Sequence, residues 1–267
     1  MNFVKKILNK INYLFFPQNL LAKKPLQTKE FYLKIFHDSI KNKNKKLEEI
    51  LLKKKLYIDH KWFEELALHT QVTIKKSKIN YYHGKLLYSY LGSYLKDNKF
   101  DFINILETGT ARGFSSICMS KCLLDYNQQG KIVTIDVLPH NIKMYWNCID
   151  DHVSKKTRNE LLEPWKNELK NIDFLTGKTR KVLKKIKSER INFAFLDAAH
   201  NYSDVINEFC FVEKRQQKND IIFFDDVTPS MFEGVRKAIE FIKKNANYDI
   251  EEISASEERG YAIATKL

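Results

Sequence analysis

The pattern of apolar residues from position 102 to the C-terminus constrains the fold of this 267-residue chain most strongly. Short runs rich in Ile, Val and Phe alternate there with stretches of helical periodicity. The expected strands are 102–106, 131–137, 172–175, 191–196, 220–224, 248–254 and 260–265. The expected helices between them are 114–125, 139–150, 178–187, 203–214 and 232–245. Strands that alternate with helices form a parallel sheet through right-handed crossovers, so the expected fold class is α/β. No helix separates the last two strands, which predicts a closing antiparallel hairpin.

The first part of the chain predicts helices only. Helical spacing covers 28–56, with a polar break at 41–46, and continues through 59–70 and 78–97. We expect residues 1–74 to form a basic helical N-terminal extension and residues 75–267 to form the α/β domain. Residues 3–16 predict a short basic amphipathic helix, which could pack on its own domain, pack on a second subunit of a homo-oligomer, or make a peripheral membrane contact.

The net charge of +13 lies in the N-terminal part of the chain. Residues 1–100 contain 21 Lys, no Arg and 8 acidic residues, whereas residues 101–267 are neutral overall. Arg is the preferred residue for contacts to phosphates and base edges, so its absence makes a nucleic-acid partner a weaker interpretation than an anionic surface. No apolar run approaches the roughly 20 residues of a spanning helix, and the N-terminus lacks a signal-peptide core. The four cysteines form no metal-binding pattern, and we expect a cytoplasmic protein with free thiols.

A glycine-rich turn follows the first expected strand, in the run Glu107-Thr108-Gly109-Thr110-Ala111-Arg112-Gly113. A dinucleotide-binding fingerprint would place Gly where Glu107 stands, because the backbone must approach a diphosphate closely. A carboxylate at this turn suits a cationic or hydroxyl-bearing ligand better. The glycines also have a purely structural interpretation as a tight turn.

Further polar residues follow the second and third strands. Asp136 ends the second strand, where an acidic side chain can accept hydrogen bonds from both ribose hydroxyls of a nucleoside; a helix cap is the structural alternative. Gly177-Lys178-Thr179 forms another glycine turn after the third strand. In open parallel sheets ligands bind beyond the carboxyl ends of the strands, so these turns are expected at one site.

Three carboxylates and a histidine follow the fourth and fifth strands: Asp197, His200, Asp225 and Asp226. Uncompensated negative charge beside a buried strand is costly, so a cation or strong donors should be present. The oxygen ligands of the three aspartates suit Mg²⁺. His200 is a candidate general base, with a structural histidine as the alternative, and Asp226 could instead cap a helix. His69 and His83 lie in helical stretches, which favours structural roles.

Taken in this order, the motifs resemble class I S-adenosylmethionine-dependent methyltransferases, and among them the metal-dependent O-methyltransferase branch that includes catechol and macrocin O-methyltransferase-like proteins. The resemblance covers about residues 75–267 and implies a Rossmann-like sheet of seven strands, mostly parallel, with an antiparallel last strand. It also implies the site residues. The cofactor would contact Glu107, Gly109, Thr110, Gly113, Ser115, Asp136, Gly177, Lys178, Thr179 and Asp197; the metal would be held by Asp197, Asp225 and Asp226; and His200, with Asp197, would be catalytic.

The resemblance implies transfer of a methyl group from S-adenosylmethionine to a hydroxyl, with Mg²⁺ as a cofactor. The family's catechol branch has Asp-Asn where this chain has Asp225-Asp226, and Lys at the position of His200. The His200-Asn201-Tyr202 run looks like the sugar-modifying, macrocin-like branch, so the expected acceptor is a sugar, a glycan or another small polyol. The competing hypotheses are an NAD-dependent oxidoreductase and a protein that binds nucleic acid or an anionic surface on the same scaffold.

Overall fold

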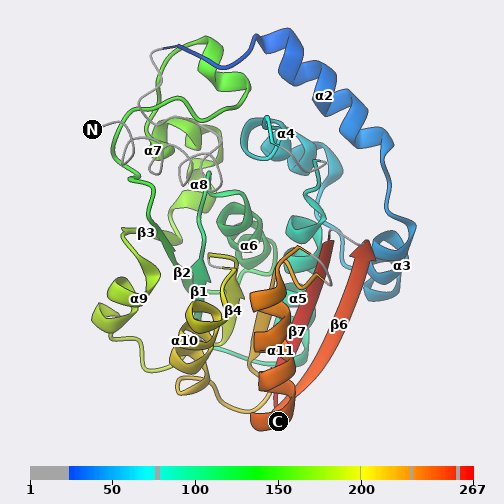
Figure 1. The fold of residues 1–267 in the computed structure, drawn as a ribbon, viewed down its shortest axis with the longest axis vertical. Coiled ribbons are helices and arrows are strands. Elements are labelled where there is room, and N and C mark those ends of the chain that lie inside the picture. The colour runs from blue at the N-terminus through cyan, green and yellow to red at the C-terminus, as the bar shows by residue number, and fades with distance from the viewer. Residues whose placement is uncertain (1–23, 76–78, 199, 229–230, 257–258) are drawn as a thin grey trace.

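The computed structural model describes residues 24–75, 79–198, 200–228, 231–256 and 259–267. Its centre is one sheet of seven strands in the order β3-β2-β1-β4-β5-β7-β6 (Figure 1). The strands are β1 (Ile103–Thr108), β2 (Gly130–Asp136), β3 (Ile172–Thr176), β4 (Phe193–Leu196), β5 (Ile221–Phe224), β6 (Tyr248–Ser256) and β7 (Arg259–Lys266). Neighbouring strands among β1 to β5 pair in parallel, and β7 runs antiparallel to both β5 and β6. The predicted α/β sheet with an antiparallel last strand is confirmed.

Both faces of the sheet are covered by helices, which explains the continuous apolar strands. Alternate side chains of a strand point to opposite faces. Phe193 and Phe195 accordingly pack in one cluster with α5 (Tyr82–Asp97) and α6 (Phe114–Asp125). Ala194 and Leu196 pack in the other with α10 (Tyr202–Glu213) and α11 (Glu233–Asn245). This double burial fixes the strand ends at which the predicted site residues lie.

Three further helices precede α5: α2 (Lys29–Lys41), α3 (Lys45–Lys54) and α4 (His60–Thr70). The predicted break after residue 41 is confirmed, and Asn44 caps α3 by accepting a hydrogen bond from the Leu47 N–H. Leu47 of α3 and Phe63 of α4 belong to the same apolar cluster as α5. Helices α3 and α4 are therefore packed on the α/β core, whereas Tyr32 and Phe36 of α2 lie in a separate apolar cluster with Val72 and Ile149. The boundary at residue 74 stays a prediction, and the amphipathic helix expected at residues 3–16 lies outside the described residues.

The helix predicted at 139–150 is wrong. The chain there is irregular, with a bridge between Met144 and Lys156 and a short 3₁₀ turn, η1 (Ile149–His152). The carboxylate of Asp151 accepts the backbone N–H groups of Trp146, Asn147 and Cys148, which would otherwise join a helical ladder. Short elements follow that the sequence did not predict: α7 (Arg158–Leu161), η2 (Glu163–Trp165) and α8 (Lys166–Leu169).

The helix predicted at 178–187 is shorter than expected, with α9 (Thr179–Val182) followed by η3 (Leu183–Lys185). Across the described part of the chain, no helix combines the length and the apolar character needed to cross a membrane.

Candidate active site

The turn after β1 depends on two glycines. Gly109 and Gly113 have φ angles of 94° and 92°, in the left-handed region that side chains disfavour. A Cβ atom on Gly109 would lie 2.2 Å from the carbonyl oxygen of Asp197, so the turn lies directly against the end of β4. Thr110 is buried, and its hydroxyl lies 2.5 Å from that of Thr134. The turn thus brings the predicted cofactor residues of β1 beside the acidic residues that follow β4.

Glu107, at the end of β1, is completely buried and accepts hydrogen bonds from the hydroxyls of Ser115 and Ser116 at the start of α6. Burial raises the pKa of Glu107, and the two serine donors only partly counter this effect. Two of the predicted cofactor residues, Glu107 and Ser115, therefore contact each other. Their contact to a cofactor stays a prediction.

Asp136 ends β2 and lies beside the glycine turn. Its carboxylate accepts the backbone N–H of Ala111 at 2.6 Å and that of Leu138 at 2.7 Å. No helix follows, so the cap alternative does not apply. Burial raises the pKa of Asp136, and the backbone donors oppose this shift. Each carboxylate oxygen can accept a further hydrogen bond, as a ribose would require.

The turn after β3 joins the same edge of the sheet. The N–H of Gly177 donates to the carbonyl of Asp136 at 2.7 Å, and Gly177 has a φ of 147°. Lys178 is exposed and precedes the first residue of α9, Thr179. The structure thus gathers the predicted cofactor residues of the first three strands at one edge.

Two arginines stabilise this edge and were not predicted. Arg158 of α7 is 1% exposed and donates to the carbonyls of Ala111, at 3.0 Å, and Leu138, at 3.3 Å. These are the two residues whose N–H groups bond Asp136, so Arg158 ties both neighbouring segments together. Arg112 donates to the carbonyl of Trp146 at 2.6 Å. Arg is scarce in this chain, with 7 residues among 46 basic ones, and that scarcity is the signal that could have singled them out.

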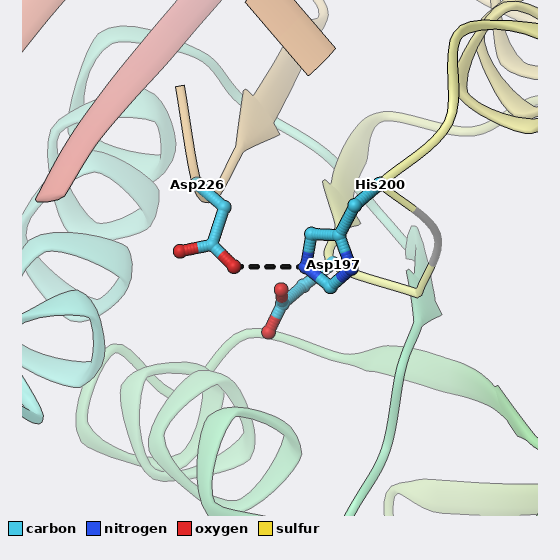
Figure 2. A group of neighbouring side chains, drawn as sticks. All are labelled: Asp197, His200 and Asp226. Carbon is cyan, nitrogen blue, oxygen red and sulfur yellow. Dashed lines mark hydrogen bonds and ion pairs between the residues drawn. The ribbon is translucent and has the colours of Figure 1, made fainter. Parts of the chain in front are cut away.

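A compact group of Asp197, His200 and Asp226 occupies the ends of β4 and β5 (Figure 2). One ligand atom from each lies within 4.8 Å of the others. The Nε2 atom of His200 is 2.8 Å from Oδ2 of Asp226, and the imidazole stacks on Phe232 with ring centres 4.1 Å apart. Asp226 has a left-handed φ of 57°, which is uncommon for a residue with a side chain. The predicted acid and histidine cluster is therefore assembled in space.

The fourth predicted member, Asp225, is buried beside this group, and its Oδ1 accepts the N–H of Asp226 at 2.7 Å. Arg259 of β7 contacts both acids, with Nη1 2.9 Å from Oδ1 of Asp226 and 3.9 Å from Oδ1 of Asp225. Sequence analysis missed Arg259 because it lies in the closing hairpin rather than after a parallel strand.

Charge is unevenly compensated in this cluster. Burial and the charges of the neighbouring aspartates raise the pKa of Asp197 well above its usual range, and burial with Asp226 does the same for Asp225. Burial also opposes ionisation of Asp226, but the hydrogen bond from His200 and the charge of Arg259 outweigh it and lower that pKa. Three carboxyls lie close together here, and Arg259 forms ion pairs with only two of them, so a further positive charge would be favourable at this site.

The side chains of this cluster are suited to hold a divalent cation. Carboxylate oxygens are the ligands that a hard divalent ion such as Mg²⁺ prefers, and the excess of acidic groups at this site favours its binding. Asp197 and Asp226 offer oxygen ligands in the compact group, and Asp225 adjoins it.

His69 and His83, the two histidines for which the sequence favoured structural roles, have contacts of that kind. His83 of α5 is buried, stacks parallel to Phe195 and meets the edge of Phe114. Burial and the nearby charge of Arg259 lower the pKa of His83 to about 3, which keeps it neutral. His69 lies 2.5 Å from Asp150 through its Nδ1 atom.

Comparison with known proteins agrees with this geometry. Residues 106–227 match a protein family described as a methyltransferase domain. No curated protein matches the sequence. The structure is similar to the O-methyltransferase from Bacillus cereus in complex with SAH, with 18% identity, coverage of 84% of this chain and 92% of that one, and a TM-score of 0.52.

Two further solved structures show the same fold. TomG from Streptomyces achromogenes, an O-methyltransferase of tomaymycin synthesis in complex with SAM, has 17% identity, coverage of 79% of this chain and 91% of its own, and a TM-score of 0.55. The O-methyltransferase NovP has 13% identity, coverage of 72% and 83%, and a TM-score of 0.53.

These findings bear on the class of protein that the sequence motifs predicted. The chain contains a methyltransferase domain and has the fold of solved enzymes of that kind. Both findings support the class I S-adenosylmethionine-dependent methyltransferase that the motifs at the strand ends predicted. The comparisons favour this class over the alternative hypothesis of an NAD-dependent oxidoreductase.

Proposed function

We propose that the enzyme methylates a hydroxyl oxygen of a sugar or another small polyol, with a divalent cation such as Mg²⁺. The observation that carries this proposal is the contact between the glycine turn and the acidic cluster, at Gly109 and Asp197. It places a polar group of acids and a histidine next to the edge where the cofactor residues gather. Three structurally similar proteins are named O-methyltransferases, which supports oxygen as the acceptor atom.

The cofactor edge binds and orients the methyl donor. Bound S-adenosylmethionine supplies an electrophilic methyl group on a sulfonium. Asp136 accepts hydrogen bonds from the ribose, and the turn from Gly109 to Gly113 lets the backbone approach the methionine part closely. Because Arg158 fixes the segments on both sides of Asp136, this edge is organised before the cofactor binds.

His200 takes the proton from the acceptor hydroxyl. Donation from Nε2 to Asp226 leaves the lone pair of Nδ1 as the proton acceptor, and Phe232 fixes the plane of the ring. The acceptor oxygen forms a bond to the methyl carbon as the carbon–sulfur bond breaks. The products are a methyl ether and S-adenosylhomocysteine, with the proton on His200.

Asp197, Asp225 and Asp226 would hold the divalent cation. When bound, such an ion lowers the pKa of a hydroxyl beside it and so favours the alkoxide. When no cation is bound, Arg259 keeps Asp226 ionised and oriented. His200 is thereby left for proton transfer.

Transfer of a radioactive methyl group from S-adenosylmethionine to a panel of sugars and polyols tests the proposal. We expect labelled methyl ethers, loss of labelling with EDTA and recovery with Mg²⁺. His200→Ala should lower turnover about 100-fold or more. His37→Ala, an exposed histidine of α2, is the matched control and should not change it.

Three results would contradict separate parts of the proposal. Labelling of amines but not of alcohols would overturn the choice of oxygen. Undiminished turnover of His200→Ala would remove the base, and full activity in EDTA would remove the cation.

A further inference from the structure

A cavity of about 710 Å³ lies between the N-terminal helices and the hairpin of β6 and β7. Its walls come from α2, α3, α4, the start of α5 with the segment before it, the end of β6 and the first residue of β7. In Figure 1, α2 and α3 lie along the side of the molecule that includes β6. Asn44 joins these elements, because its side chain donates to the carbonyl of Ala255 at the end of β6. The cavity is of the size that holds a small molecule.

Arg259 connects this cavity to the chemistry. It lines the cavity, and its guanidinium also contacts Asp226. Lys75 lines the cavity as well and interacts electrostatically with Arg259, Asp225 and Asp226. A molecule held in the cavity would therefore extend toward the acidic cluster.

The acidic groups in the cavity wall already have partners. Glu64 accepts a hydrogen bond from the hydroxyl of Tyr81 at 2.7 Å, and Glu48 accepts one from Tyr82 at 2.8 Å. Asp38 lies 3.8 Å from the ammonium of Lys41. Because these acidic side chains already have partners within the protein, a bound cation is not needed to compensate their charge.

Two lysines of the cavity wall, Lys75 and Lys85, differ from these acidic residues because they lack a partner of opposite charge among the described residues. Within the described chain, neither Lys75 nor Lys85 makes an ion pair with an acidic side chain. The ammonium of Lys85 lies over the rings of Phe63 and Tyr82, at 5.2 and 5.3 Å from their centres. Burial and the charges of Arg259 and Arg112 lower the pKa of Lys75 to about 8, which leaves the amine largely protonated at neutral pH. The unpaired charge on this wall is positive.

We propose that this cavity is the acceptor site and that it selects a sugar or polyol that bears an anionic group, a carboxylate or a phosphate. The inference rests on the proposed function and deepens it. Lys75 and Lys85 bind the anionic group, since an ammonium is a compact donor that matches both oxyanions. The aromatic side chains and amides of the wall, such as Tyr82 and Asn80, contact the apolar and hydroxyl parts of the ring. Neutral sugars lack the group that pairs with the two lysines.

Saturation-transfer NMR on the full-length protein with bound S-adenosylhomocysteine tests this selection. The probes are D-glucuronate, D-glucose 6-phosphate and D-glucose. We expect at least one anionic probe to bind about tenfold more tightly than glucose, which corresponds to about 1.4 kcal/mol. The better of the two anionic probes distinguishes a carboxylate from a phosphate substituent.

Matched variants locate the site. Lys75→Gln and Lys85→Gln should each weaken the anionic probe about fivefold or more, and Lys34→Gln, an exposed lysine of α2 outside the cavity, should not. Calorimetric titration with S-adenosylhomocysteine should give the same affinity for all three variants. Equal binding of glucose and both anionic probes, or indifference of the anionic probe to both lysine variants, would overturn the inference. Failure of the proposed function would look different, since the protein would then transfer no methyl group to any hydroxyl.

Discussion

The two halves of the active-site edge are stabilised in different ways. At the ends of β1, β2 and β3, polar groups bond to one another and to the backbone: Asp136 holds two N–H groups, Arg158 two carbonyls, and Glu107 two serines. At the ends of β4 and β5, Arg259 pairs with Asp225 and Asp226, and Asp197 beside them has no ion pair among the described residues. The first half is therefore preorganised to bind a cofactor, whereas the second keeps a charge imbalance that a cation and a substrate can resolve. Variants in one half should leave the function of the other intact.

The largest effect is expected for Asp226→Asn. This change removes the charge that orients His200 and attracts a cation but conserves the shape of the side chain. We expect turnover to fall about 100-fold or more, as for the loss of an electrostatic group in an active site. Steady-state kinetics with labelled cofactor measures it. Turnover within a few fold of the wild type would show that the acidic cluster is not where the reaction occurs.

Divalent cations should stabilise the wild-type protein through the same cluster. At a concentration 100 times the dissociation constant, binding to the folded state adds about 2.7 kcal/mol. Thermal unfolding with and without Mg²⁺ or Mn²⁺ should show a higher midpoint for the wild type and none of this shift for Asp197→Asn. An equal shift in both proteins would place the ion elsewhere.

Arg158→Lys probes the cofactor half. Lysine keeps the charge but cannot donate to both carbonyls with the planar geometry of a guanidinium. We expect about tenfold weaker binding of S-adenosylhomocysteine, because the segments around Asp136 lose their common donor. Calorimetry measures the affinity, and Arg236→Lys, at an exposed position of α11, is the control. Unchanged affinity would mean that the backbone alone holds this edge.

The smallest effect concerns Glu208 of α10, which is buried beneath the β1 end and accepts a hydrogen bond from Thr108 at 2.8 Å. Its other oxygen has no partner among the described residues, and burial raises its pKa to about 8. A raised carboxyl pKa means that the folded state retains a proton that the unfolded state loses, so stability decreases as the pH rises from about 4.5 to about 8.

Glu208→Gln removes this ionisation. We expect a gain of about 1 kcal/mol in the free energy of unfolding near pH 8 and little change near pH 4.5. Urea unfolding at the two pH values measures it. A gain of the same size at both would show that the ionisation of Glu208 is not its cause.

Most of the fold could be predicted because its strands are buried on both faces. Phe193 to Leu196 and Ile221 to Phe224 are continuous apolar runs, and such runs identify the strands of a covered parallel sheet. The segment 139–150 could not be predicted in this way. Its apolar spacing resembles that of a helix, but the carboxylate of Asp151 takes up the N–H groups that a helix would use.

The predicted site residues are the ones that directly follow strands, because the carboxyl ends of parallel strands share one edge. Arg158 and Arg259 could not be found by that rule. Arg158 comes from α7, in the segment between β2 and β3, and Arg259 comes from an antiparallel strand whose position beside β5 depends on the sheet order. The cavity that we propose as the acceptor site was also missed, since its wall combines helices α2 and α3 with the start of β7.

The most direct test of the division between the two halves is calorimetric titration of S-adenosylhomocysteine into Asp136→Ala and Asp226→Asn. We predict at least about tenfold weaker binding by Asp136→Ala, which loses a hydrogen-bond acceptor for the cofactor. Asp226→Asn should bind with the affinity of the wild type. Wild-type affinity in Asp136→Ala, or an equal loss in both variants, would contradict the account.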